Sequence, residues 1–179
     1  MKHTKSPMLL VSLALLCVHL TAHAQDTCQQ LKAALAAAPN QFSRFKGSWD
    51  QESETYETSW TYGPATDCFM SYYEDSGYSL RCTYDVSSLE SGRSVAEGWL
   101  RDIQACVGSH KLVLNDWREH SRSGQRISMK GAFREIETGL TNQYDARISV
   151  GASCTTYHRN NRERCHAYID VELLGDEKE

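Results

Sequence analysis

The sequence lacks the motifs and the charge that commonly identify an enzyme or a nucleic-acid-binding protein. It contains no G-x-S-x-G or H-E-x-x-H motif and no glycine-rich phosphate loop, which argues against the familiar hydrolase and nucleotide sites. No two cysteines have the C-x-x-C spacing of thiol oxidoreductases. The formal net charge of −4 gives no general attraction to nucleic acid. We therefore expect a protein that is not an enzyme, holds no cofactor and does not bind nucleic acid.

The N-terminal apolar run is too short to cross a membrane as a helix. It extends from Met8 to Leu20, which is 13 residues, whereas a spanning helix needs about 20. Two lysines precede the run, and an Ala-His-Ala tripeptide ending at Ala24 follows it. This is the pattern of a secretory signal peptide with its cleavage site. We predict a signal peptide over residues 1–24, a periplasmic or secreted mature protein, and no stable membrane anchor after cleavage.

The rest of the chain has the length and cysteine content of one disulfide-stabilised domain. Removing residues 1–24 leaves 155 residues and shifts the net charge to −6, because that segment carries two lysines and no acid. This length fits a single domain with one core. We place that domain at residues 25–175, before a charged tail at 176–179. Cys17 leaves with the signal peptide, and six cysteines in an exported chain predict disulfides. They are Cys28, Cys68, Cys82, Cys106, Cys154 and Cys165.

Two segments have the apolar periodicity of helices. The first begins near Cys28 and ends near Pro39, and a short helical turn over residues 41–45 follows it. The second begins with Ser94 as its N-cap and ends at Gly108. Its wide apolar stripe predicts that one face packs against the core.

Alternating apolar and polar residues predict three antiparallel strands between these helices, at 54–62, 68–73 and 77–86. A three-residue turn at 74–76 places Cys68 opposite Cys82, and two further apolar pairs fall on the same side of the sheet. The register that pairs the apolar residues thus brings two sulfur atoms together. We predict a Cys68–Cys82 disulfide.

Four more strands are expected after the second helix. A hairpin over 111–120 and 125–135 turns at 121–124, and a longer hairpin has Arg159-Asn160 at its tip. This tip sets Cys154 opposite Cys165, and four small or apolar pairs fall on the same side. We predict a Cys154–Cys165 disulfide.

The last two cysteines then belong to the two helices. A Cys28–Cys106 bridge would tie both helices over one face of the sheet. A bridge from a strand to a helix, such as Cys82–Cys106, is the main alternative, and the sequence does not decide between them.

The order helix, three strands, helix, four strands predicts an α+β fold. Two helices pack on a largely antiparallel sheet that disulfides stabilise, and the order suggests a duplicated α-βββ unit. Tandem layouts of this kind are similar to those of some secreted inhibitors, such as the β-lactamase-inhibitor type. That resemblance concerns the fold alone.

A zinc site is the alternative to the second hairpin disulfide. Cys154, His158, Cys165 and His166 are the residue types of a tetrahedral zinc site at short spacing. Adjacent strand residues point to opposite faces, so His166 cannot share the face of Cys165. An oxidising compartment also favours the disulfide. We therefore expect no metal, and we expect the histidines to be solvated on the surface.

Two groups of residues are candidates for binding a partner. Tyrosines and a tryptophan gather in the first three strands; most are expected to pack on the sheet, and Tyr73 is expected to be the exposed ring. Arginines gather at the tips of both later hairpins, where they steer an acidic partner or simply guard the strand edges against aggregation. The candidate partner-binding residues are Tyr73, Arg118, Arg122, Arg159, Arg162 and Arg164.

A small oxidised scaffold with aromatic and arginine-rich edges and no catalytic set suggests a protein-binding module. Its most concrete form is an inhibitor or immunity-type protein of the bacterial periplasm, which blocks a target with a hairpin tip. The alternatives are an envelope hydrolase or small-ligand binder with an unfamiliar site, and an accessory component of a secretion or surface apparatus. The protein partner and the oligomeric state are not identified by the sequence.

Overall fold

The computed structural model describes residues 26–74, 77–107, 112–138, 141 and 146–173. The signal peptide expected at 1–24 and the tail expected at 176–179 lie outside the described residues, as do Gly108 and His110.

The described chain contains two α-helices, two short 3-10 helices and nine strands. The N-terminal helix covers residues 26–37 and continues into the 3-10 helices Ala38–Asn40 and Ser43–Phe45. The second α-helix is α2, Leu89–Val107. The strands are β1 Lys46–Asp50, β2 Thr55–Thr58, β3 Asp67–Tyr73, β4 Gly77–Val86, β5 Leu112–Leu114, β6 Arg118–Ser123, β7 Ile127–Thr138, β8 Ala146–Tyr157 and β9 Arg162–Leu173.

The nine strands form one antiparallel sheet. Their order is β1-β2-β3-β4-β9-β8-β7-β5, and β6 also pairs with β7. An α+β fold is thus present. Because β4 pairs with the last strand, β9, the two halves of the chain share a single sheet. The duplicated α-βββ unit stays a prediction.

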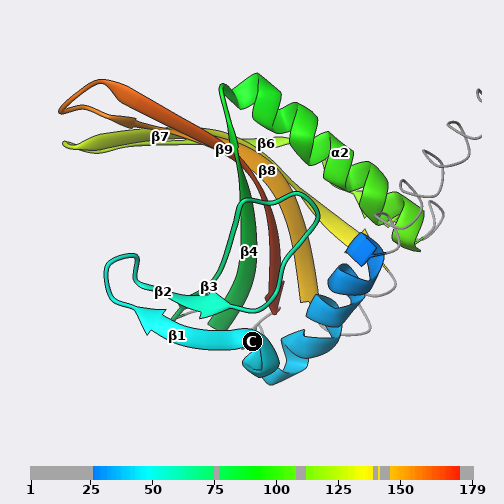
Figure 1. The fold of residues 1–179 in the computed structure, drawn as a ribbon. Helices are drawn as coiled ribbons and strands as arrows, with labels where there is room; N and C mark the ends of the chain where they lie inside the picture. The colour runs from blue at the N-terminus through cyan, green and yellow to red at the C-terminus, as the bar shows by residue number, and fades with distance from the viewer. Residues whose placement is uncertain (1–25, 75–76, 108–111, 139–140, 142–145, 174–179) are drawn as a thin grey trace, which may run out of the picture.

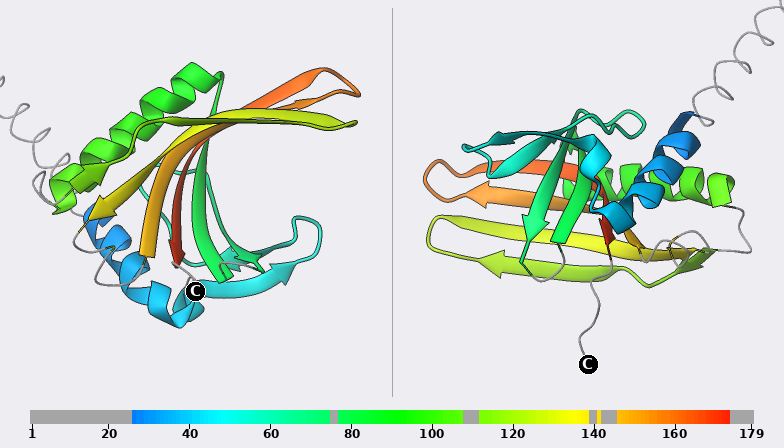
Figure 2. Two further views of the ribbon diagram at one scale, coloured as in Figure 1. Left: turned by 180° about the vertical axis from the view of Figure 1, so that it is seen from behind. Right: turned by 90° about the horizontal axis from the view of Figure 1, so that it is seen from below.

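The sheet is strongly bent, and both α-helices lie on its convex side (Figure 1). The view from behind shows the same arrangement, with the β6–β7 and β8–β9 hairpins projecting beyond α2 (Figure 2). The helices cover apolar side chains that alternate along the central strands, such as Ile148 and Val150 of β8 and Ile169 and Val171 of β9. This packed side holds the core.

The registers of both disulfide-bearing hairpins agree with the expectation from the sequence. Cys68 pairs with Cys82, and the neighbouring pairs are Met70–Leu80 and Tyr72–Tyr78. Cys154 pairs with Cys165 in the long hairpin, where four further pairs also fall as expected. Those four are Ala152–Ala167, Val150–Ile169, Ile148–Val171 and Ala146–Leu173.

Three disulfides connect the six cysteines of the described chain. Two bridges join the directly opposed pairs of β3–β4 and β8–β9, and the third joins Cys28 of the N-terminal helix to Cys106 in the last turn of α2. Three intrachain disulfides suggest an oxidising environment, such as the periplasm or the cell exterior.

Helix α2 begins earlier than the sequence indicated. It starts at Leu89 instead of after Ser94, because Ser88 caps it: the Ser91 amide donates to Ser88 Oγ at 3.1 Å, and the Ser88 amide donates to Ser91 Oγ at 3.0 Å. Gly92 lets this first turn approach the sheet, since a Cβ there would lie 2.6 Å from a side-chain carbon of β8. The helix is therefore seated on the sheet at its N-terminal end.

Several strand boundaries also differ from the prediction. The strand expected at 54–62 ends at Thr58, and the aromatic residues Trp60 and Tyr62 leave it to enter the core, where the Trp60 indole donates to the Gln30 carbonyl at 3.0 Å. The segment 111–120 contains two strands, β5 and β6, and both pair with β7. The turn expected at 121–124 lies at 124–126. Strand β1 was not predicted.

Candidate binding sites on the open face

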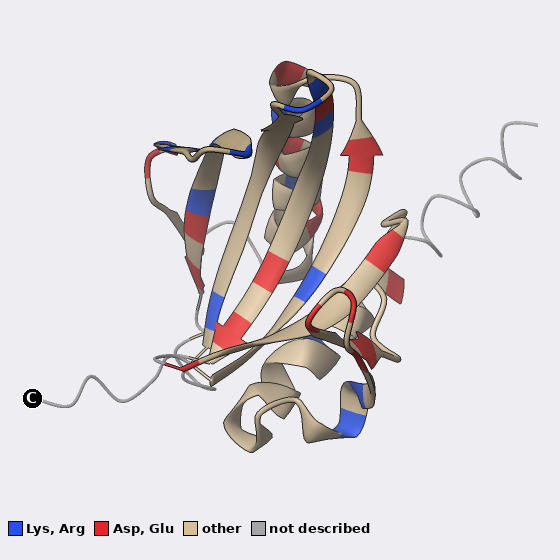
Figure 3. Cartoon of the chain, turned by 90° about the vertical axis from the view of Figure 1, so that its left-hand side faces the viewer, with Lys and Arg blue, Asp and Glu red and all other residues tan. Residues whose placement is uncertain are grey.

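The sheet has a second face, which we call the open face, turned away from both helices. Because side chains alternate along a strand and paired residues share a face, paired residues of neighbouring strands form rows across the open face. One row is Glu135, Ser149, Asp170 and Arg81, from β7, β8, β9 and β4. Figure 3 looks towards this side, and charged positions lie in the middle of the central strands.

A buried ion pair lies at the centre of the open face. The Arg81 guanidinium donates from Nε to Asp170 Oδ2 at 3.0 Å, and Nη2 of Arg81 contacts the same oxygen. Asp170 is fully buried, and burial raises the pKa of its carboxyl while Arg81 acts against that shift. The ring of Tyr168 lies 4.9 Å from the guanidinium carbon, and burial raises the pKa of this tyrosine to about 12. The Tyr168 hydroxyl is therefore neutral at any physiological pH.

A second group of charges forms a chain beside this pair. Arg147 contacts Glu135 Oε1 at 3.4 Å and Glu172 Oε2 at 2.5 Å, and Arg118 contacts Glu135 Oε2 at 3.4 Å. The bond to Glu172 is the main reason why the pKa of Arg147 is raised. Arg118 was expected to serve a partner at a hairpin tip, but its guanidinium lies beside Glu135.

A hollow of about 330 Å³ opens between these two groups. The rings of His120, Phe133 and Tyr168 line it together with Ser149. Its charged lining consists of Arg81, Glu135, Arg147 and Glu172. It is the candidate small-molecule site of the open face. Sequence reasoning missed it, because it depends on the long-range pairing of β4 with β9.

Ser153 and His166 form a second polar contact on this face. Ser153 Oγ and His166 Nε2 are 3.0 Å apart, on neighbouring strands. Burial and the charge of Arg81 lower the pKa of His166, and Asp85 of β4 acts in the opposite direction. The expectation of solvated histidines is thus wrong for His166, which is half-buried.

His120 also departs from that expectation. Its ring is half-buried on β6, and its Nδ1 atom is buried without a hydrogen-bond partner among the described residues. His158, in contrast, is exposed at the tip of the long hairpin.

The tips of the two later hairpins lie side by side and form one surface. Ile127 of β7 pairs with Tyr157 of β8, and the His158 amide donates to the Arg126 carbonyl at 2.9 Å. Five exposed arginines gather there, and we call this surface the arginine end. They are Arg122, Arg126, Arg159, Arg162 and Arg164.

The arginine end combines unpaired positive charge with exposed apolar area. Lys130 pairs with Glu163 at 3.1 Å, but none of the five arginines has an acidic partner among the described residues. Ile127 and Tyr157 are 42% and 40% exposed, and because they are strand partners their exposed apolar areas adjoin. This surface thus holds four of the six predicted partner-binding residues.

Tyr73 lies elsewhere, on β3, at the other end of the open face. It is 41% exposed, but Tyr72, which was expected to pack, is more exposed at 54%. Tyr72 lies on the packed side of the sheet, but neither helix of the described chain covers it. Its ring belongs to a row with Tyr78, Tyr56 and Trp49, whose neighbouring centroids are 4.7–5.8 Å apart.

A lysine covers the middle of this aromatic row. Nζ of Lys46 lies 4.0 Å from the Tyr56 centroid and 2.8 Å from the Tyr78 hydroxyl, which raises the pKa of Lys46 and lowers that of Tyr78. Ser43 and Lys46 have the S-x-x-K spacing of some acyl-transferring enzymes. The lysine amine, however, points onto the tyrosines.

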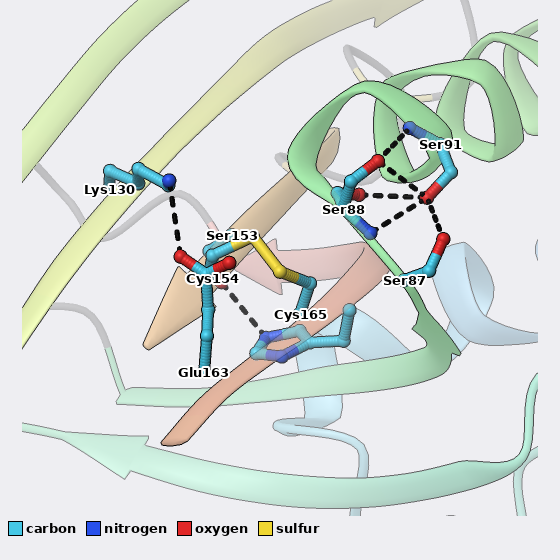
Figure 4. Close-up of a disulfide and its surroundings, with 9 residues drawn as sticks. Ser87, Ser88, Ser91, Lys130, Ser153, Cys154, Glu163 and Cys165 are labelled. Atoms are coloured by element: carbon cyan, nitrogen blue, oxygen red, sulfur yellow. Dashed lines mark hydrogen bonds and ion pairs between the residues drawn. A yellow bond between two sulfur atoms is a disulfide. The ribbon is translucent and has the colours of Figure 1, made fainter. Parts of the chain in front are cut away.

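The described residues offer one cluster with metal-ligand geometry, and its sulfur atoms are already bonded. It consists of Cys154, Glu163 and Cys165, and the two cysteines form the hairpin disulfide. Figure 4 shows this bridge, with the carboxylate of Glu163 turned to Lys130. The zinc interpretation is therefore not supported by this geometry.

Fold and sites together define a disulfide-stabilised α+β protein with a polar open face and a basic end. No known protein family matches its sequence, and no curated protein does so. Within the described part of the chain, no helix has the length and apolarity to span a membrane.

Proposed function

We propose that the protein is an exported protein-binding module that recognises an acidic surface of another protein with its arginine end. The observation that supports this most is the set of five arginines without acidic partners beside the exposed Ile127 and Tyr157. Arginine and tyrosine are enriched among the residues that dominate binding energy. An inhibitor or immunity-type role in the periplasm is the form that best suits a projecting, rigid pair of hairpins.

The charge distribution supports an acidic partner. The chain as a whole is acidic, with a net charge of −4, whereas the arginine end concentrates five positive charges on two hairpin tips. Such a contrast orients an approaching acidic surface and raises the association rate more than the affinity. Binding should therefore weaken as salt rises, since exposed charges are screened beyond about 10 Å at 0.1 M.

Reversing charge at the arginine end tests the proposal. The double variant Arg159→Glu/Arg162→Glu should lose a partner that the wild-type protein retains from envelope extract, and its affinity for the purified partner should fall at least roughly tenfold. The matched control is Lys32→Glu/Arg101→Glu, which makes the same charge change on exposed helix positions. Equal binding by both variants would refute the role of the arginine end, and repeated absence of a stoichiometric partner would refute the function.

A hydrolase is the second candidate, because Ser153 and His166 are within hydrogen-bond distance. A nucleophile with an adjacent base is the minimum of a serine hydrolase. Ser153 is buried, however, so attack would require access that the described residues close. A fluorophosphonate probe should label Ser153 in the wild type and fail with His166→Ala if this candidate is correct, with His158→Ala as the control. If the probe does not label the wild-type protein, the hydrolase candidate is rejected and the protein-binding proposal stands.

A further inference from the structure

Two glycines make the hollow on the open face possible. A Cβ atom on Gly131 would lie 2.4 Å from Cε1 of His120, and one on Gly151 would lie 2.7 Å from Cζ of Tyr168. The rings of His120 and Tyr168 therefore lie over the backbone of these glycines, in the space that a side chain at either position would occupy. Phe133 lies between them, as the strand partner of Gly151, and its ring centroid is 5.9 Å from that of His120. The result is an aromatic floor beside the charged groups of the central strands.

The charges around this floor are balanced. Two guanidinium groups, from Arg81 and Arg147, and two carboxylates, from Glu135 and Glu172, line the hollow. Each carboxylate is already within ion-pair distance of an arginine. Beside each group that attracts a charged ligand there is therefore a group of the ligand's own sign that repels it. A charged ligand would gain little net attraction.

We propose that the hollow binds a neutral sugar residue. Adjacent guanidinium and carboxylate groups offer donors and acceptors side by side, which matches the neighbouring hydroxyls of a sugar, and hydrogen bonds to charged groups are the stronger kind. The apolar C–H face of the ring would lie on Phe133 and Tyr168. The volume of about 330 Å³ is at the small end of ligand pockets, so it fits one or two rings.

This site is separate from the arginine end and does not depend on the proposed function. The hollow lies over the central strands, whereas the arginine end lies at the hairpin tips. Loss of sugar binding and loss of partner binding can thus be observed independently.

Titration of the ¹⁵N-labelled, disulfide-intact protein with D-glucose, D-galactose and N-acetyl-D-glucosamine tests the proposal. At least one sugar should give saturable shifts of the amides of Ser149, Gly151 and Tyr168, with saturation transfer to the sugar C–H protons. Glycine and acetate serve as a zwitterionic and an anionic probe. Absence of saturable shifts with all three sugars, or tighter binding of glycine or acetate, would overturn the proposal.

Two variants locate the binding. Glu172→Gln keeps the shape but removes one charged acceptor, and it should weaken sugar binding at least roughly tenfold. Phe133→Ala should weaken it roughly threefold or more by removing part of the floor. Glu163→Gln is the matched control, since it breaks a similar ion pair outside the hollow. The amide spectrum of each variant verifies folding, and unchanged affinity in both hollow variants would contradict the assignment of the site.

Discussion

Replacing Arg81 with methionine should destabilise the protein more than replacing its partner Asp170 with asparagine. The two groups are unequally buried: the side chain of Asp170 is fully buried, whereas that of Arg81 is 29% exposed. Without Arg81, the carboxylate keeps its burial and loses the charge that compensates it. Without the carboxylate, the guanidinium can still reach water.

The expected magnitudes follow from this difference. Removing one partner of a buried ion pair costs about 3–5 kcal/mol when the remaining charge stays buried, and we expect this range for Arg81→Met. For Asp170→Asn we expect about 1–3 kcal/mol, because partial exposure of Arg81 reduces the cost. The double variant Arg81→Met/Asp170→Asn leaves no charge behind and should recover about 2–3 kcal/mol relative to the sum of the two single variants.

The pH dependence has a definite sign. Arg81 lowers the pKa of Asp170 against the raising effect of burial, so its removal raises that pKa further. A carboxyl group with a raised pKa in the folded state contributes stability below its unfolded pKa of about 4 and loses it as pH rises through the folded pKa. The deficit of Arg81→Met relative to wild type should therefore be smaller near pH 4 and larger near pH 7.

Urea denaturation of the oxidised protein, followed by far-ultraviolet circular dichroism, measures these differences. Three results would refute the reasoning: a cost of Arg81→Met below about 0.5 kcal/mol, which is the range of ordinary surface changes; a double variant equal to the sum of the singles; or a deficit that shrinks as pH rises.

Three further predictions concern packing, protonation and the longest disulfide loop. Gly92→Ala should lower the free energy of unfolding in urea by about 1–3 kcal/mol, because α2 already touches the sheet there. Gly98→Ala should raise it by up to about 1 kcal/mol, since only a flexible arginine lies near that position, at 3.7 Å. Equal effects of the two variants would contradict the close contact of α2 with the sheet at Gly92. Because burial lowers the pKa of His166, the unfolded state binds more protons below about pH 6.5, so the melting temperature should fall from pH 7.5 to 5.5 in wild type and less so in His166→Gln. Replacing Cys28 and Cys106 with alanine should cost about 4.5 kcal/mol, against about 3 for either bridge between adjacent strands, because it opens a 78-residue separation; an equal cost would argue against the loop-entropy explanation.

Local hairpin register could be predicted because several constraints coincide in it. In the long hairpin, one choice of tip pairs Cys154 with Cys165 and also pairs every apolar residue on the same side. A shift of one residue would have separated the sulfur atoms and moved the apolar side chains to the other face. Burial of the apolar side chains and formation of the disulfide therefore select the same register, and both constraints can be recognised from the spacing of the residues in the sequence.

The hollow could not be predicted, because its residues come together through pairs that are distant in sequence. Arg81 and Asp170 are 89 positions apart and meet only when β4 lies beside β9. In the sequence, each of these two residues has the pattern of an ordinary polar residue on the solvent side of a strand. The one local signal was glycine inside long strands, at Gly131 and Gly151, which often marks a close approach of another group.

The position of the Cys154–Cys165 bridge connects the fold to the proposed function. The bridge lies where the long hairpin leaves the core: both cysteines are buried, and residues 157–164 beyond them are exposed. A two-stranded hairpin without a packed face is marginally stable in water, so the projecting part depends on the bridge and on pairing with β7. A clamp at this point holds Arg159, Arg162 and Arg164 near one geometry before a partner arrives. In the proposed function, such preorganisation would reduce the ordering cost of binding a partner, which is consistent with a disulfide at the base of the hairpin, where the support of the packed core ends.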